Sequence, residues 1–100
     1  MRRVAVTGLG AVTPLGNDAR STWRAAIGGE SGIDFIKSFD ASAFPVRVAA
    51  EVKDFDPAGL VSTKEARRLD RNVLLALAAA VEAKDDAALN GFDPSRVGVV

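Results

Sequence analysis

The apolar pattern at the start of the chain predicts a buried strand followed by a glycine-rich loop. Residues 4–7 read Val-Ala-Val-Thr, without polar alternation, which is typical of a strand covered on both faces by helices. The next stretch carries Gly8, Gly10, Pro14 and Gly16. This spacing lets the backbone turn tightly and approach other groups closely. We therefore expect the first helix to begin only after Gly16.

That first helix is predicted over residues 19–27. Asn17 or Asp18 is a suitable N-cap, and the pair Gly28-Gly29 ends the helix. Trp23 and Ile27 are four residues apart, so both are expected to face the core. A single aromatic residue is a weak binding signal, and we therefore interpret Trp23 as a packing anchor.

The helix is followed by apolar residues without a clear period. Residues 33–44 contain three phenylalanines and two isoleucines, and we expect an ordered loop packed by its own aromatic side chains. Residues 46–53 then alternate between apolar and polar or small positions, the period of a half-exposed strand. A turn is predicted over residues 54–59.

A second helix start is marked by a capping box. Ser62 and Glu65 are three residues apart ahead of a helical run, which fixes the helix start at Thr63.

Four cations follow at helical spacing. Lys64, Arg67, Arg68 and Arg71 fall at i, i+3, i+4 and i+7, so an uninterrupted helix places all four on one face. Alternatively, Asp70 caps a second helix and breaks this stripe after Arg68.

The most apolar segment is predicted to be a buried helix. Residues 73–81 are nine consecutive apolar residues, and a helix that is apolar all round is buried. The run is well short of the roughly eighteen residues that span a bilayer. We expect Asn90-Gly91 to end this helix, Asp93-Pro94 to make a turn, and residues 97–100 to begin another buried strand.

Composition excludes several classes of function. The 100 residues are 48% hydrophobic, enough for one modest core, so the chain counts as one domain or part of one. Thirteen basic and thirteen acidic residues balance, so the net charge of the whole chain gives no reason to expect binding to nucleic acid or a membrane.

The absence of cysteine and histidine excludes thiolate metal sites and Ser-His or Cys-His catalysis within these residues. The N-terminus lacks a signal-peptide cleavage site, which favours a cytoplasmic protein.

A strand followed by glycines also suggests a dinucleotide-binding loop, but the spacing argues against it. The pattern G-x-G-x-x-G needs a glycine where the chain has Thr13. The related pattern of short-chain reductases needs a glycine at Val12. A nucleotide-binding reductase therefore stays as a minor alternative, and no cofactor is assigned.

Four motifs occur in one order: VTGLGAVTPLG, STWRAAIGGESGI, FDASAFPVRVAAEVKDFDP and KEARRLDRN. Together they closely resemble the start of β-ketoacyl-[acyl-carrier-protein] synthases of the type II elongation class, and the resemblance covers residues 4–100. Each motif is weak alone, but the ordered set is highly specific. Polyketide ketosynthases and their non-catalytic chain-length partners look similar here and remain alternatives.

The resemblance implies an α/β fold of the thiolase-like type, layered α-β-α-β-α, with a mostly parallel sheet and a buried central helix. Residues 1–100 would be the N-terminal part of the synthase domain, ending inside a strand. In this family a cysteine takes the acyl chain from a carrier protein, and two histidines assist decarboxylation of malonyl-carrier protein. The carbanion then attacks the acyl thioester. These residues come later in the chain, so no catalytic residue is assigned here.

The resemblance also implies a binding site. In similar synthases the basic positions of the K-E-x-R-[RK] segment contact the acidic acyl carrier protein, and they correspond here to Lys64, Arg67 and Arg68. Clustered cations raise the encounter rate with an acidic partner and orient it. The alternative is an ordinary solvated helix face. The family likeness further implies a homodimer for the full-length chain.

Overall fold

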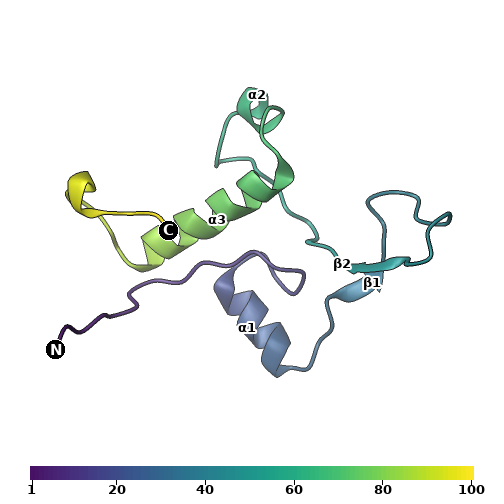
Figure 1. The fold of residues 1–100 in the computed structure, drawn as a ribbon, viewed down its shortest axis with the longest axis horizontal. Coiled ribbons are helices and arrows are strands. Elements are labelled where there is room, and N and C mark those ends of the chain that lie inside the picture. The colour runs from purple at the N-terminus through teal and green to yellow at the C-terminus, as the bar shows by residue number, and fades with distance from the viewer.

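The computed structural model describes residues 1–100. Its elements, in chain order, are α1 (Ala19–Ile27), β1 (Ile33–Phe35), β2 (Val48–Ala50), α2 (Thr63–Ala66), α3 (Arg71–Asp86) and the 3₁₀ turn η1 (Pro94–Arg96). The N-terminal stretch runs between α1 and α3, and the β1-β2 hairpin and α2 project from this centre (Figure 1). The radius of gyration is 16.8 Å, against about 13 Å for a compact domain of this length. The chain is therefore less compact than a typical folded domain of this length.

Helix α1 has the predicted bounds, and Asp18 is its N-cap. The Asp18 carboxylate accepts the backbone N–H of Ser21 at 2.6 Å. At the other end, Gly29 is left-handed at φ 73°, and the N–H of Glu30 reaches back to the carbonyl of Ala25 at 3.0 Å. This is a Schellman end, in which glycine takes the left-handed position without steric cost.

The prediction for the face of α1 is wrong within these residues. Ala25 is the buried residue of the helix, whereas Trp23 and Ile27 are 67% and 66% exposed. The side of the helix that carries Ala25 lies toward the rest of the chain. Trp23 borders an open groove with Leu9 and Val81 and stays mostly exposed, so it is not a packing anchor within these residues.

The predicted strand at residues 4–7 does not form a ladder in the structure. Val4 and Val6 are 95% and 80% exposed, and no backbone hydrogen bond joins this stretch to another segment. A strand needs a neighbour to satisfy its N–H and C=O groups. None of the 100 residues supplies one, and residues 97–100, the other predicted strand, likewise form no ladder.

Residues 33–50 form a hairpin, which corrects the prediction of a loop at 33–44 and shortens the predicted strand at 46–53. Strands β1 and β2 are antiparallel, with Ile33 opposite Ala50 and Phe35 opposite Val48. Three-residue strands are too short to show a period in the sequence. The predicted aromatic packing does occur in the connecting loop, where Phe39 and Phe44 meet edge to face at 5.9 Å.

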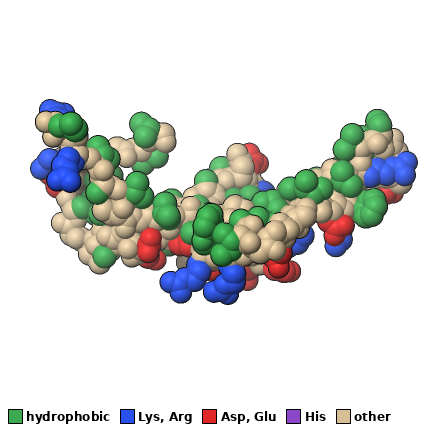
Figure 2. Space-filling view, turned by 90° about the horizontal axis from the view of Figure 1, so that it is seen from below, with side chains coloured by type: hydrophobic (Ala, Val, Ile, Leu, Met, Phe, Trp, Pro, Cys, Tyr) green, Lys and Arg blue, Asp and Glu red, His purple; other side chains and the backbone are tan.

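Helix α3 is the longest element, and residues 1–100 do not by themselves supply the all-round burial predicted for it. Only Leu74 is buried along the helix, while Val73 and Val81 are 44% and 39% exposed. The N-terminal stretch covers one side, and the remaining sides have no covering layer in the described chain. Figure 2 shows hydrophobic side chains exposed to solvent at several places on the face in view, among charged side chains.

The end of α3 comes earlier than predicted. The helix ends at Asp86 rather than at Asn90-Gly91, because Ala88 turns left-handed at φ 51°. The N–H of Leu89 donates to the carbonyl of Lys84 at 3.2 Å, which completes a Schellman motif. None of the helices is long and apolar enough to cross a membrane.

Candidate docking surface

Helix α2 is a single capped turn that presents three cations. The Ser62 hydroxyl accepts the N–H of Glu65 at 3.2 Å, and the Glu65 carboxylate accepts the N–H of Ser62 at 3.1 Å. The predicted capping box and the start at Thr63 are therefore confirmed. The hydrogen bond from the Ser62 backbone, followed by that from its hydroxyl, lowers the pKa of Glu65 below 4.5, so this carboxylate is ionised at neutral pH.

The structure brings Lys64, Arg67 and Arg68 together on this turn. Arg67 is the C-cap in right-handed helical conformation, so it keeps helical spacing from Lys64, and the N–H of Arg68 donates to the carbonyl of Glu65 at 2.9 Å. All three side chains are exposed. The one ion pair in the structure joins Lys37 and Asp34, so these three cations have no carboxylate partner.

Arg71 does not belong to the same surface. The helix breaks after Arg68, and Asp70 is the N-cap of α3, which decides between the two arrangements that the sequence left open. The Arg71 guanidinium donates to the carbonyl of Val52 at 3.1 Å, and its central carbon is 5.8 Å from the centroid of the Phe55 ring. The predicted stripe of four is therefore three free cations and one that is bound within the chain.

The glycine-rich loop has carboxylates where a nucleotide phosphate would bind. The Glu82 carboxylate accepts the N–H of Ala11 at 2.9 Å and that of Ala19, at the start of α1, at 2.8 Å. Asp86 accepts the N–H of Leu9 at 3.0 Å. A phosphate on these amides would meet two negative charges. The geometry therefore argues against the nucleotide-binding alternative, and the glycines serve close packing instead.

Gly8 and Gly10 lie directly against the backbone of α3. A Cβ atom on Gly8 would collide with the carbonyl oxygen of Ala83, and one on Gly10 with that of Ala79. The sequence predicted close approach at these glycines but not its target. The acidic residues four apart on α3, Glu82 and Asp86, were the signal that could have indicated it.

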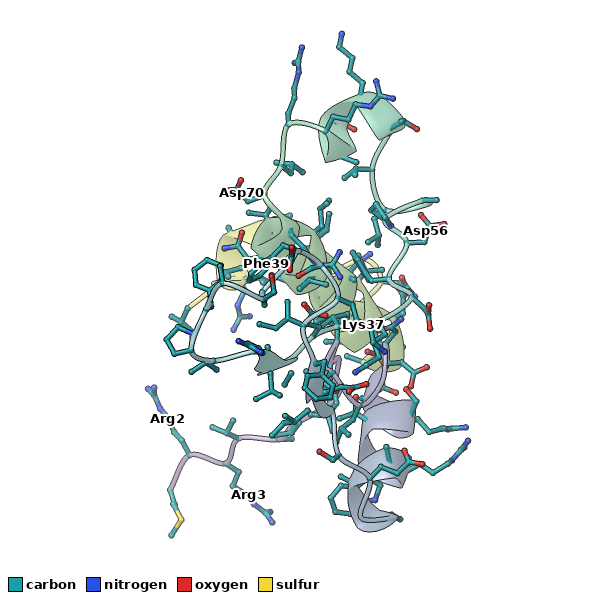
Figure 3. The ribbon with its side chains drawn as sticks, turned by 90° about the vertical axis from the view of Figure 1, so that its right-hand side faces the viewer. Arg2, Arg3, Lys37, Phe39, Asp56 and Asp70 are labelled. Atoms are coloured by element: carbon teal, nitrogen blue, oxygen red, sulfur yellow. The ribbon has the colours of Figure 1, made fainter.

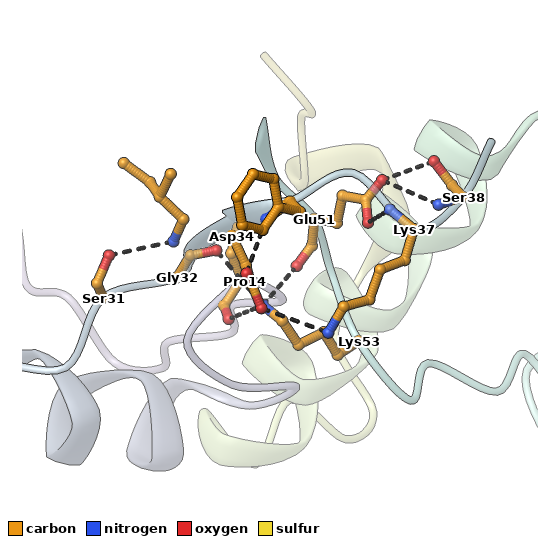
Figure 4. A network of polar contacts seen from close by, with 10 residues as sticks. Pro14, Ser31, Gly32, Asp34, Lys37, Ser38, Glu51 and Lys53 are labelled. Atoms are coloured by element: carbon orange, nitrogen blue, oxygen red, sulfur yellow. Dashed lines mark hydrogen bonds and ion pairs between the residues drawn. The ribbon is translucent and has the colours of Figure 1, made fainter. Parts of the chain in front are cut away.

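A cavity of about 480 Å³ lies beside the hairpin, and most of its polar side chains are already engaged. The Lys53 ammonium donates to the carbonyls of Pro14, Gly32 and Glu51 at 3.2–3.4 Å. The Glu51 carboxylate accepts the Ser38 hydroxyl at 2.6 Å, and this bond is the main cause of its lowered pKa. Figure 4 shows these bonds joining three separate segments. The cavity is therefore held by structural contacts, and no group of metal-ligating side chains converges here or elsewhere.

The chain is similar to known proteins over its whole length. The sequence model of the beta-ketoacyl synthase N-terminal domain matches residues 1–100. The chain is 47% identical over 100 residues to the 3-oxoacyl-[acyl-carrier-protein] synthase 2 of Coxiella burnetii and 44% identical to that of Vibrio harveyi, covering 98% of this chain and 24% of each relative. Among solved structures, the ishigamide ketosynthase/chain length factor matches with a TM-score of 0.77 at 34% identity, covering 89% of this chain and 22% of that one.

The chain belongs to the beta-ketoacyl synthase family, to its N-terminal domain. It spans about a quarter of the length of the curated relatives it matches. The predicted family and its α/β, thiolase-like fold class are thereby confirmed.

Proposed function

We propose that this chain is the N-terminal part of an elongating β-ketoacyl-[acyl-carrier-protein] synthase of fatty-acid biosynthesis. The observation that carries the proposal is the 47% identity to a 3-oxoacyl-[acyl-carrier-protein] synthase 2, spread over 98% of the chain. The reaction is the decarboxylative condensation of malonyl-carrier protein with an acyl chain held on an enzyme cysteine. The resemblance also supports a cytoplasmic homodimer as the state of the full-length protein.

Residues 1–100 contribute scaffold and docking rather than chemistry. They contain no cysteine and no histidine, so the nucleophile and the two histidines of the family lie outside them. We propose that Lys64, Arg67 and Arg68 contact the acidic acyl carrier protein. Their exposure and their lack of carboxylate partners support this role, because a free cationic cluster attracts and orients an acidic protein. An ordinary solvated helix face is the competing interpretation.

A second candidate function is favoured by the solved structure. The ishigamide protein pairs a ketosynthase with a chain length factor, and the same scaffold in that class serves either polyketide condensation or a non-catalytic partner role. The residue at the nucleophile position separates these functions, because a partner subunit without the cysteine cannot hold the acyl chain.

The experiment is the intact mass and sequence of the native gene product, followed by a condensation assay with acyl- and malonyl-carrier protein. The proposal predicts a mass several times 10.4 kDa, one nucleophilic cysteine, two later histidines, and a β-ketoacyl product two carbons longer. A product with another residue in place of the cysteine and no condensation would contradict it and support the chain-length partner. A polyketide synthase would be revealed by repeated condensation without reduction.

A further inference from the structure

Helix α2 lies at the tip of an excursion of the chain that has few connections to the rest. The excursion leaves after β2 and returns at the start of α3 (Figure 1). Every hydrogen bond of residues 55–69 is made within that same segment. Figure 3 shows Asp56 and Asp70 on the two legs of the excursion, below the α2 turn. The position of α2 relative to the rest of the chain therefore depends on contacts at the base of the excursion.

Arg71 closes this base. It is the first residue of α3 and bonds to the carbonyl of Val52, nineteen positions earlier, at 3.1 Å. Its guanidinium also faces the ring of Phe55 at 5.8 Å, and a cation over an aromatic ring is attracted by the electrons of the ring face. One side chain thus joins the outgoing leg of the excursion to the returning leg.

We propose that Arg71 is a positioning residue for carrier docking: it holds the α2 turn, and with it Lys64, Arg67 and Arg68, at a fixed place relative to α3. This inference rests on the proposed carrier-docking function. Arg71 acts through Val52 and Phe55 and does not itself contact the carrier protein. A cation with the same net charge but without these two contacts therefore cannot replace it.

The test uses the full-length protein and compares KM and kcat for carrier-bound substrate with those for a carrier-free pantetheine thioester. Phe55→Leu removes the ring face and leaves every charge in place, and Arg71→Gln removes the guanidinium. Both are expected to raise KM for the carrier substrate roughly two- to fivefold, the factor equivalent to one exposed cation–π contact. Both should leave kcat and the carrier-free KM unchanged. Arg24→Gln, an exposed arginine on α1, is the matched control for loss of one charge and should leave all values unchanged.

The same variants are then made in the background Lys64→Glu/Arg67→Glu/Arg68→Glu. If Arg71 works by positioning these cations, Phe55→Leu has no further effect once they are reversed. An undiminished effect of either substitution in that background would overturn the inference, since Arg71 would then act independently of the three cations. If the triple reversal itself leaves the carrier KM unchanged, the docking function is wrong. If the reversal raises KM and the Phe55 and Arg71 variants do not, the positioning inference alone is wrong.

Discussion

Gly10 lies so close to Ala79 on α3 that a Cβ atom added to the glycine would overlap the Ala79 carbonyl oxygen. The two residues are far apart in the chain, and their contact places the N-terminal loop directly on the longest helix. The requirement for glycine at this position is a matter of space, because Gly10 has no positive φ.

We therefore expect Gly10→Ala to destabilise the protein by about 1 to 3 kcal/mol, the usual cost of overpacking a close contact. Denaturant unfolding of the full-length protein measures this loss. Gly28→Ala is the matched control, since Gly28 has an ordinary helical φ of −75° and its nearest contact for a Cβ is 3.2 Å away. Equal effects of the two substitutions would show that the contact with Ala79 does not matter.

The Glu82 carboxylate is expected to hold the loop and α1 on α3. It accepts two backbone N–H groups, from Ala11 and from Ala19. Glu82→Ala leaves both donors without this acceptor, at a cost of about 1 to 3 kcal/mol. Glu82→Gln should cost less, because the amide oxygen still accepts one of the two. The same unfolding experiment tests this order, and a glutamine variant as unstable as the alanine variant would contradict it.

Replacing Ala88 with glycine should stabilise the protein. Ala88 takes the left-handed C′ position of α3 at φ 51°, where a side chain costs about 1 to 2 kcal/mol. After allowance for the greater chain entropy of glycine, Ala88→Gly should stabilise the protein by roughly 0.5 to 1 kcal/mol. The neighbouring Ala87→Gly, at φ −75°, should instead destabilise it. Opposite signs in thermal unfolding support the geometry, and loss of stability in both variants would refute it.

The capping box of α2 predicts a pH dependence. Hydrogen bonds from Ser62 lower the pKa of Glu65 from 4.5. The contribution of this carboxylate to stability is therefore complete above pH 4.5 and is lost as the pH falls through the lowered value. A titration of the Glu65 side chain by NMR should give a pKa below 4.5, and Ser62→Ala should raise it toward 4.5. A Glu65 pKa that does not respond to Ser62→Ala would show that the hydroxyl does not contribute.

The two helix ends show why one boundary was predictable and the other was not. In α1 the left-handed residue is Gly29, and glycine marks such an end in the sequence. In α3 the same motif uses Ala88, and an alanine is indistinguishable from the helix interior. The N-caps followed the same logic, because Asp18 and Ser62 carry the side-chain acceptor that their positions require.

Burial and long-range contacts could not be predicted from the apolar pattern alone. The pattern indicates that the apolar surface of α3 needs cover, but not which residues supply it, and Val73 and Val81 remain open here. For the docking surface, spacing indicated the cluster of Lys64, Arg67 and Arg68. The sequence also allowed the break that separates Arg71 from that cluster, but it could not indicate that Arg71 bonds to the carbonyl of Val52.

The most direct test of the docking proposal is the Kd between the full-length protein and acyl carrier protein at low and high salt. Lys64→Glu/Arg67→Glu/Arg68→Glu should raise Kd roughly tenfold or more at low salt, with the difference shrinking as salt screens the charges. The control Arg20→Glu/Arg24→Glu/Arg96→Glu changes the net charge equally at exposed residues elsewhere, and it should have a much smaller effect. Equal Kd values for the two triple variants would mean that α2 is a solvated face and that the carrier protein binds elsewhere.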